Sequence, residues 1–205
     1  MPHAPNTYNS HVSCTYSDHS TLGMYVLHGT EAVYFTLQNK CSATIWPGTL
    51  SGTGPLLING GTRLKPGQSI TIDVPYKWSG RFWARTNCKF DRTGKGTCAT
   101  GDSGGLEHCG GAGGAPPVTL AEFTLDDKNF YDVSLVDGYN IPISIYPYDG
   151  TGDCKKVECS ANLKLRCPKD LRVVNNGKIV ACKSACTAYN TLNIVASILL
   201  RWSLW

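Results

Sequence analysis

The sequence predicts an all-β protein, an antiparallel β-sandwich with a small disulfide-rich lobe of loops and a helix. Short apolar runs alternate with turn residues, and the 205-residue chain contains 22 glycines and 11 prolines. A hydrophobic content of 41% is sufficient for one substantial core. Ten cysteines are many for a cytosolic domain, and their spacing lacks the CxxC pairs of zinc sites. This composition favours a disulfide framework in an oxidising compartment.

Several segments alternate apolar and polar residues with the period of a half-buried strand. Val33, Phe35 and Leu37 mark the first of them. Ile70, Ile72 and Val74 mark the second, after a Lys-Pro-Gly-Gln turn. Glycine, proline or Asp-Gly sequences bound each segment, as expected for strands joined by turns. The other predicted strands cover residues 81–86, 119–125, 131–136 and 141–146.

Changes in composition divide the chain into four parts. Residues 1–20 are polar and lack the apolar core of a signal peptide, and we expect the atypical N-terminal segment 1–30 to be disordered. Residues 31–153 form the predicted sandwich domain. Residues 154–190 form a partial cysteine-rich lobe with a short helix near 184–189. Residues 191–205 form an apolar tail that is too short to cross a bilayer, which takes about twenty apolar residues.

The charge pattern excludes an ordinary nucleic-acid interface. The formal net charge is +4, and the lysines and arginines are scattered rather than clustered. No motif indicates a metal or cofactor site. We therefore expect a monomer without cofactor, metal, nucleic acid or transmembrane span.

Residues 101–105 read Gly-Asp-Ser-Gly-Gly, the sequence around the nucleophile of chymotrypsin-like serine proteases. A serine nucleophile requires a histidine base and an acid that orients this base. The histidines that precede Ser103 have no matching context, and His108 follows it closely within a glycine-rich loop. The spacing fits no known order of a catalytic triad, so we exclude a serine protease.

Motifs over residues 31–190 occur in an order and spacing typical of one family. They are NKCSATIWPG (39–48), SGRFWARTNC (79–88), GKGTCATGD (94–102), PPVTLAEFTL (116–125), FYDVSLVDGYNIP (130–142) and VACKSAC (180–186). On these residues the chain resembles the thaumatin-like proteins, the fifth pathogenesis-related family of plants. The resemblance implies the sandwich-and-lobe fold and an extracellular location in the apoplast, although no signal peptide is visible.

The resemblance also implies roles for the cysteines. Cys88 and Cys98 match one complete disulfide pair, and Cys167 and Cys182 match another. Cys109 matches a cysteine whose usual partner follows Gly-Asp, where this chain has Ser103. We therefore expect Ser103 to lie near Cys109, to leave its thiol unpaired and to have no histidine base. The family partners of the other cysteines lie beyond residue 190, which predicts a truncated product that lacks the closing strands; these cysteines are Cys41, Cys154, Cys159 and Cys186.

In the family, one arginine and four acidic residues line a cleft between sandwich and lobe. The residues that carry over by motif are Arg81, Glu122, Asp132 and Asp137. Two carboxylates can serve as acid and base on a glycosidic bond. Glu122 is the predicted proton donor, because partial desolvation in a strand would raise its pKa. Asp137 is the predicted base, with Arg81 and Asp132 holding geometry and charge. Strict alternation separates Asp132 from Asp137, unless Asp137 lies in a turn before Gly138.

These residues leave several functions open. The leading hypothesis is an antifungal defence protein that binds β-1,3-glucan, or a fungal membrane component, through the acidic cleft. The alternatives are a weak endo-β-1,3-glucanase, a protein inhibitor of a hydrolase, and an inactive truncated product with exposed sheet edges. An Arg81–Asp132 pair that only ties two strands together is the non-functional interpretation. Three aromatic residues are either sandwich core or sugar-stacking groups, namely Trp78, Phe82 and Trp83.

Overall fold

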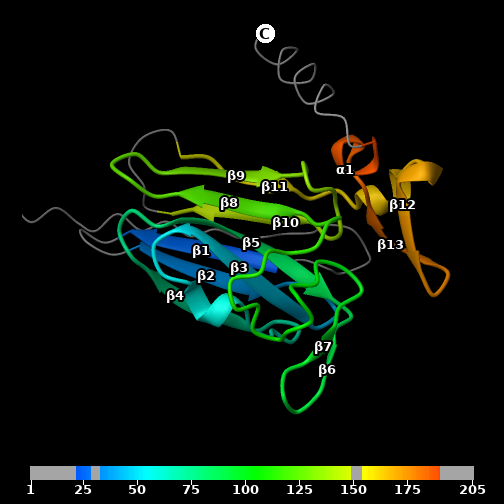
Figure 1. Cartoon of the computed structure of the whole chain (residues 1–205). Helices are drawn as coiled ribbons and strands as arrows, with labels where there is room; N and C mark the ends of the chain where they lie inside the picture. Colours follow the sequence, from blue (N-terminus) through cyan, green and yellow to red (C-terminus); the bar gives the residue numbers. More distant parts are fainter. Residues whose placement is uncertain (1–21, 29–32, 149–153, 190–205) are drawn as a thin grey trace, which may run out of the picture.

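Two β-sheets form the main body of the molecule, and a small lobe lies at one end of them (Figure 1). The computed structural model describes residues 22–28, 33–148 and 154–189. We call residues 160–189 the cysteine lobe, because the strand β11 (Val157–Cys159), which the sequence analysis assigned to the lobe, pairs with the sandwich strand β10 (Ile143–Pro147). The strands are β1 (Leu22–His28), β2 (Val33–Asn39), β3 (Ile45–Thr53), β4 (Ser69–Val74), β5 (Ser79–Thr86), β6 (Lys89–Phe90), β7 (Gly96–Thr97), β8 (Leu120–Thr124), β9 (Phe130–Ser134), β10 (Ile143–Pro147), β11 (Val157–Cys159), β12 (Arg172–Asn175) and β13 (Lys178–Cys182). The helices are the 3-10 turns η1 (Leu57–Gly60), η2 (Leu163–Arg166) and η3 (Lys169–Leu171), and α1 (Ala185–Tyr189).

The first sheet has the strand order β11-β10-β1-β2-β4. In β2 the side chains of Val33, Phe35 and Leu37 are buried while their neighbours are partly exposed, which confirms the alternation predicted from the sequence. The expectation of an all-antiparallel sandwich needs one correction, because β1 pairs with β10 in parallel. The expected disorder of residues 1–30 is wrong for Leu22–His28, since β1 pairs with both β2 and β10. The rest of that segment lies outside the described residues.

The second sheet has the strand order β3-β5-β8-β9, and its inner face packs on the first sheet. Phe35 of the first sheet lies at the centre of this contact. Its ring centroid is 5.7 Å from that of Phe82 in β5 and 4.5 Å from that of Phe123 in β8. Aromatic pairs at such distances stabilise a core beyond the apolar area that they bury. The predicted strands at residues 81–86, 119–125, 131–136 and 141–146 are confirmed as β5, β8, β9 and β10, with small shifts at their ends.

The outer face of the second sheet is covered at one end by the loop of residues 101–118. Trp83 of β5 lies fully buried beneath this loop, and its indole nitrogen donates a hydrogen bond of 2.9 Å to the carbonyl of Gly101. Two glycines, Gly48 and Gly114, lie close to the Trp83 ring. A β-carbon at Gly48 or Gly114 would lie 2.5 Å from the indole. The ring therefore lies in a slot that leaves no room for a side chain at either of these two positions.

The cysteine lobe contains a hairpin that the sequence analysis did not predict. Strands β12 and β13 pair antiparallel around a turn at Asn176 and Gly177, both with positive φ. The Asn-Gly pair is a strong signal for such a turn. The predicted short helix is confirmed as α1. Tyr139 joins the lobe to the sandwich, because it exchanges two backbone hydrogen bonds of 2.8 Å with Cys182.

Candidate functional site

Three of the four predicted cleft residues lie in one row across the second sheet. The strand register aligns Arg81 of β5 with Glu122 of β8, and Glu122 with Asp132 of β9. Leu50 of β3 continues the row on the other side of Arg81. Directly opposed residues in an antiparallel sheet have β-carbons about 4.5–5.5 Å apart and share one face. Phe123, next to Glu122, is buried in the core, so the row lies on the outer face.

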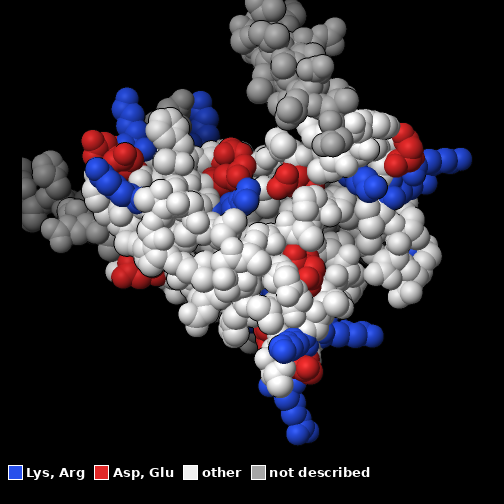
Figure 2. Space-filling view, in the orientation of Figure 1, with Lys and Arg blue, Asp and Glu red and all other residues white. Residues whose placement is uncertain are grey.

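The row borders a cavity of about 310 Å³, which we call the acidic cavity. Acidic side chains with a basic group among them gather over β8 and β5 on this face (Figure 2). Glu122 is partly buried and Asp132 is exposed. The lining includes Leu50, Ser51, Ser79, Arg81, Glu122, Thr124, Phe130 and Asp132. The cavity thus combines carboxylates, one guanidinium, hydroxyls and an aromatic ring.

The surroundings of Glu122 in the cavity raise the pKa of its carboxyl group. Desolvation is the main reason that its pKa is raised, and the like charge of Asp132 raises it further. The charge of Arg81 and the hydroxyl of Ser134 act in the opposite direction. Desolvation also raises the pKa of Asp132. A carboxyl that keeps its proton to higher pH can act as a proton donor or as a hydrogen-bond donor to a neutral ligand.

Arg81 and Asp132 do not form the strand-tying pair of the non-functional interpretation. Glu122 and the whole of β8 separate them in the sheet. In the described part of the chain, no ion pair joins Arg81 to a carboxylate. The guanidinium is therefore available to a ligand in the cavity.

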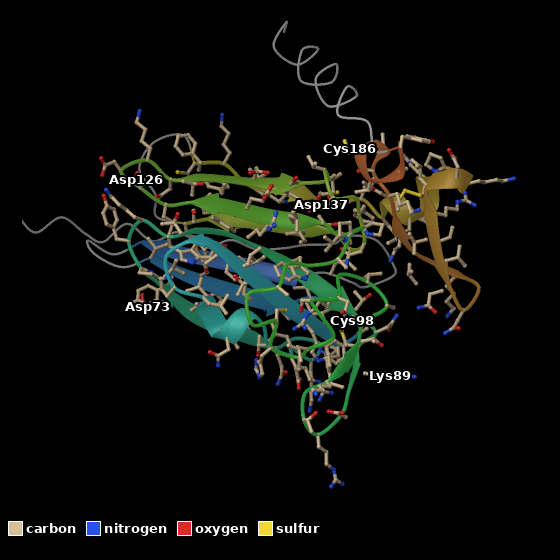
Figure 3. All side chains as sticks on the ribbon, viewed as in Figure 1. Asp73, Lys89, Cys98, Asp126, Asp137 and Cys186 are labelled. Atoms are coloured by element: carbon tan, nitrogen blue, oxygen red, sulfur yellow. A yellow bond between two sulfur atoms is a disulfide. The ribbon has the colours of Figure 1, made fainter. Side chains whose placement is uncertain are left out.

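Asp137 lies apart from this row. It stands in a turn after β9, in which Gly138 donates a backbone hydrogen bond of 2.9 Å to Leu135, so strand alternation does not govern its direction. The neighbouring Val136 carbonyl accepts a hydrogen bond of 2.6 Å from Ser184 of the cysteine lobe. Asp137 is thus at the junction of sandwich and lobe (Figure 3). It does not line the acidic cavity, yet its charge contributes to the raised pKa of Glu122.

The aromatic residue at the cavity is one that sequence reasoning missed. Trp78, Phe82 and Trp83 are all fully buried, which confirms the core alternative for them and excludes the sugar-stacking one. Phe130, by contrast, is 66% exposed and lines the cavity. It lies two residues before Asp132 in β9. This period of two places both side chains on one face and was the signal available in the sequence.

Ser103 is not a nucleophile in this structure. It is fully buried, and its hydroxyl contacts the thiol of Cys109 and accepts a hydrogen bond of 3.2 Å from Arg85. The His108 ring has a different hydrogen-bond partner, since its Nδ1 lies 2.9 Å from the carbonyl oxygen of Gly61. Within the described residues, no histidine contacts the Ser103 hydroxyl.

Two disulfides join the pairs that the family resemblance implied. Cys88–Cys98 closes the β6–β7 hairpin, and Cys167–Cys182 ties η2 to β13. Cys109 is buried without a disulfide. Burial raises the pKa of its thiol, although Ser103 and Arg85 act in the opposite direction. The thiol is therefore a structural group rather than a reactive one.

Two other kinds of site are absent from the described residues. Among the described residues, no three His, Cys, Asp or Glu side chains are grouped as metal ligands would be. In the same part of the chain, no helix is both long and apolar enough to span a membrane.

Comparisons with known proteins agree with one another. The sequence model of the thaumatin family matches residues 39–195. The chain is 56% identical over 176 residues to pathogenesis-related thaumatin-like protein 3.5 of Cryptomeria japonica, covering 84% of this chain and 73% of that protein. It is also 56% identical over 163 residues to pathogenesis-related protein 5 of Arabidopsis thaliana, covering 78% and 67%.

Two further similarities concern proteins whose names state an activity. The chain is 46% identical over 169 residues to a glucan endo-1,3-beta-glucosidase of Prunus avium, covering 80% of this chain and 69% of that protein. Among solved structures, the thaumatin-like xylanase inhibitor TLXI is 31% identical, with a TM-score of 0.46 over 58% of this chain and 94% of the inhibitor.

Proposed function

Since this chain belongs to the thaumatin family of plant defence proteins, we propose that its acidic cavity binds β-1,3-glucan of fungal cell walls. The observation that carries the proposal is the aligned row of Arg81, Glu122 and Asp132 beside the exposed ring of Phe130. A pyranose offers hydroxyl groups to carboxylates and a guanidinium, and its apolar face can cover an aromatic ring. The row and the ring meet both requirements in one cavity.

Binding of laminarin oligosaccharides, measured by titration calorimetry, tests this proposal. Asp132→Ala is expected to lower the affinity about tenfold, because charged hydrogen-bond acceptors for sugar hydroxyls are lost. Asp73→Ala serves as the matched control, since Asp73 is an exposed aspartate of β4 in the other sheet and does not line the cavity (Figure 3). Equal affinities of the two variants would refute binding in the acidic cavity.

A second candidate function is weak endo-β-1,3-glucanase activity. The raised pKa of Glu122 favours this activity, as does the name of the similar glucan endo-1,3-beta-glucosidase of Prunus avium. In this reaction Glu122 gives its proton to the glycosidic oxygen as the bond from that oxygen to the anomeric carbon breaks. Asp137 takes a proton from the water that adds to the anomeric carbon. Because the acid and the base must flank one glycosidic bond, the scissile bond would lie between Glu122 in the acidic cavity and Asp137 beside the cysteine lobe.

Release of reducing sugar from laminarin separates catalysis from binding. Glu122→Gln is expected to lower the rate at least a hundredfold while oligosaccharide affinity is retained, because Gln keeps the shape but cannot donate a proton to the leaving oxygen. The control Asp73→Asn should leave the rate unchanged. A wild-type protein that binds laminarin and releases no sugar would refute the glucanase and preserve the binding function.

We place this activity outside the cell, in the apoplast, with the protein acting as a monomer. The disulfides support an oxidising compartment. Fractionation of apoplastic fluid followed by size-exclusion chromatography checks both parts of this placement. Recovery of the protein only from the cell interior, or only as an oligomer, would contradict it.

A further inference from the structure

A second hollow lies between two hairpins that are far apart in the sequence. One wall is the β6–β7 hairpin with its flanking residues, and the other is the β12–β13 hairpin of the cysteine lobe (Figure 1). The hollow has a volume of about 550 Å³, and we call it the hairpin groove. It shares no lining residue with the acidic cavity. Its chemistry can therefore be considered separately.

The hairpin groove is lined mainly by hydrogen-bonding side chains without a negative charge. Lys89 and Lys178 contribute one ammonium group from each hairpin, and no aspartate or glutamate lines the groove. In the described part of the chain neither lysine forms an ion pair. Three amides and a hydroxyl complete the polar lining, namely Asn87, Asn175, Asn176 and Thr97. All six of these side chains are exposed.

The polar side chains of this lining have no competing hydrogen-bond partners among the described residues. Across the described residues, the side chains of Asn87, Thr97, Asn175 and Asn176 take part in no hydrogen bond. Donors and acceptors that the protein leaves unused on facing walls can serve a ligand between them. The two lysines favour a negatively charged ligand, since an anion would contact two ammonium groups and meet no carboxylate on the walls.

Both walls are held in place before any ligand binds. Cys88–Cys98 closes the base of one hairpin, and Cys167–Cys182 anchors a strand of the other. Asn176 has a φ of 48° in the turn before Gly177, a conformation that asparagine tolerates better than most residues. A ligand would therefore find its partners already positioned, which reduces the entropy lost on binding.

We propose that the hairpin groove binds an acidic polysaccharide, specifically a segment of uronic acid residues. Each uronate presents a carboxylate for an ammonium group and several hydroxyls for amides, which both donate and accept hydrogen bonds. The groove volume falls within the range of about 300–1,000 Å³ that is usual for ligand sites. Val180 and Ala99 provide only small apolar contacts, which disfavours a protein partner that needs a buried aromatic anchor.

Titration of the full chain with a galacturonic acid hexamer at low, fixed salt tests the proposal. The double variant Lys89→Gln/Lys178→Gln is expected to lower the affinity at least about tenfold, because two charge-assisted contacts are lost. The matched control is Lys65→Gln/Lys128→Gln, which removes two exposed lysines outside the groove and makes the same change in net charge. The control should change the affinity by less than about twofold. Equal losses in the two double variants would overturn the proposal.

Variants at Asn176 and a modified ligand test the groove without removing a lysine. Asn176→Gly keeps the positive φ and should weaken binding several-fold, whereas Asn176→Asp places a like charge in the groove and should weaken it at least about tenfold. The methyl ester of the hexamer should bind at least about tenfold more weakly than the free acid. Equal binding of ester and acid would refute recognition of the carboxylates. Tighter binding of a polyglutamate peptide than of the hexamer, lost with the same lysines, would replace the polysaccharide by an acidic protein.

Discussion

Arg85 is a fully buried guanidinium whose hydrogen bonds hold the loop that contains Ser103. Its side-chain nitrogens donate to the backbone carbonyls of Trp46, Leu106 and Glu107 at 3.0, 2.7 and 2.7 Å. The Ser103 hydroxyl accepts a further bond. Burial lowers the pKa of this arginine, but the group stays charged at every physiological pH. One arginine thus closes a loop that has no covalent closure in this chain.

The contact between Ser103 and Cys109 leads to a direct prediction. Ser103→Cys is expected to form a disulfide with Cys109 and to raise the free energy of unfolding by about 2 kcal/mol, because a covalent link restricts the unfolded chain. The melting temperature should rise by about 4–8 °C. Thermal unfolding combined with thiol titration of the denatured protein measures both effects.

Ser103→Ala is the matched control for this disulfide. It removes one hydrogen bond to Arg85 without adding a link, so the free energy of unfolding should fall by about 1 kcal/mol. A Ser103→Cys protein that keeps both thiols and the wild-type melting temperature would contradict the placement of the two side chains.

A strand whose side chains are alternately buried and exposed could be predicted from its sequence. Alternation identified β2, because one face of that strand meets the core and the other meets solvent. The same rule did not predict β3, because burial does not alternate along that strand, which contains Pro47 and Gly48. Strand β3 lies at the edge of its sheet, and proline is tolerated at an edge because it needs no partner for a backbone N–H.

The candidate site was predictable only in part for a related reason. Family motifs identified Arg81, Glu122 and Asp132, but their alignment depends on the register of three strands, which no local pattern specifies. Phe130 was missed because exposure of an aromatic residue is decided by what the rest of the fold leaves uncovered. The motifs alone also could not separate Asp137 from the row, since its direction depends on a turn.

The β8–β9 pair predicts an unusual dependence of stability on pH. Glu122 and Asp132 have folded-state pKa values above their ordinary values of 4.5 and 3.8. Their stabilising contribution is therefore complete below those ordinary values and is lost as pH rises through the raised pKa values. Glu122→Gln should match the wild type in acid and become progressively more stable than it as pH rises toward neutrality.

Melting temperature measured across this pH range checks the prediction. Asp73→Asn is the control, because Asp73 is exposed on the other sheet and is not part of the row. A constant difference in melting temperature between Glu122→Gln and the wild type at all pH values would show that the Glu122 carboxyl is not perturbed in the folded protein.

In the whole molecule, hydrogen bonds from the segment that follows β9 join the sandwich to the cysteine lobe. Tyr139 pairs with Cys182, and Ser184 bonds to the Val136 carbonyl. The acidic cavity belongs to the sandwich, whereas the hairpin groove requires both parts. Loss of order in the lobe should therefore affect one ligand site and spare the other.

Removal of the lobe disulfide tests this independence. Cys167→Ser/Cys182→Ser is expected to lower the free energy of unfolding by about 3 kcal/mol, because the bond closes a loop with a sequence separation of 15. Hydrogen exchange should show loss of protection in β12 and β13 and retained protection in β5 and β8. The comparison variant Cys88→Ser/Cys98→Ser should expose only the β6–β7 hairpin. Equal loss of protection throughout the sandwich in both variants would contradict separate stability of the two parts.

The slot around Trp83 gives the protein a built-in optical reporter. Leu50 packs against the cluster that contains Trp83 and also lines the acidic cavity, so one side chain separates the indole from a bound ligand. An indole held between two glycine walls and hydrogen-bonded to a carbonyl is shielded from water and should emit at short wavelength. Occupation of the neighbouring cavity would press on Leu50 and alter that emission. The fluorescence of Trp83, once separated from that of the other four tryptophans, can thus follow events at the cavity without any added label.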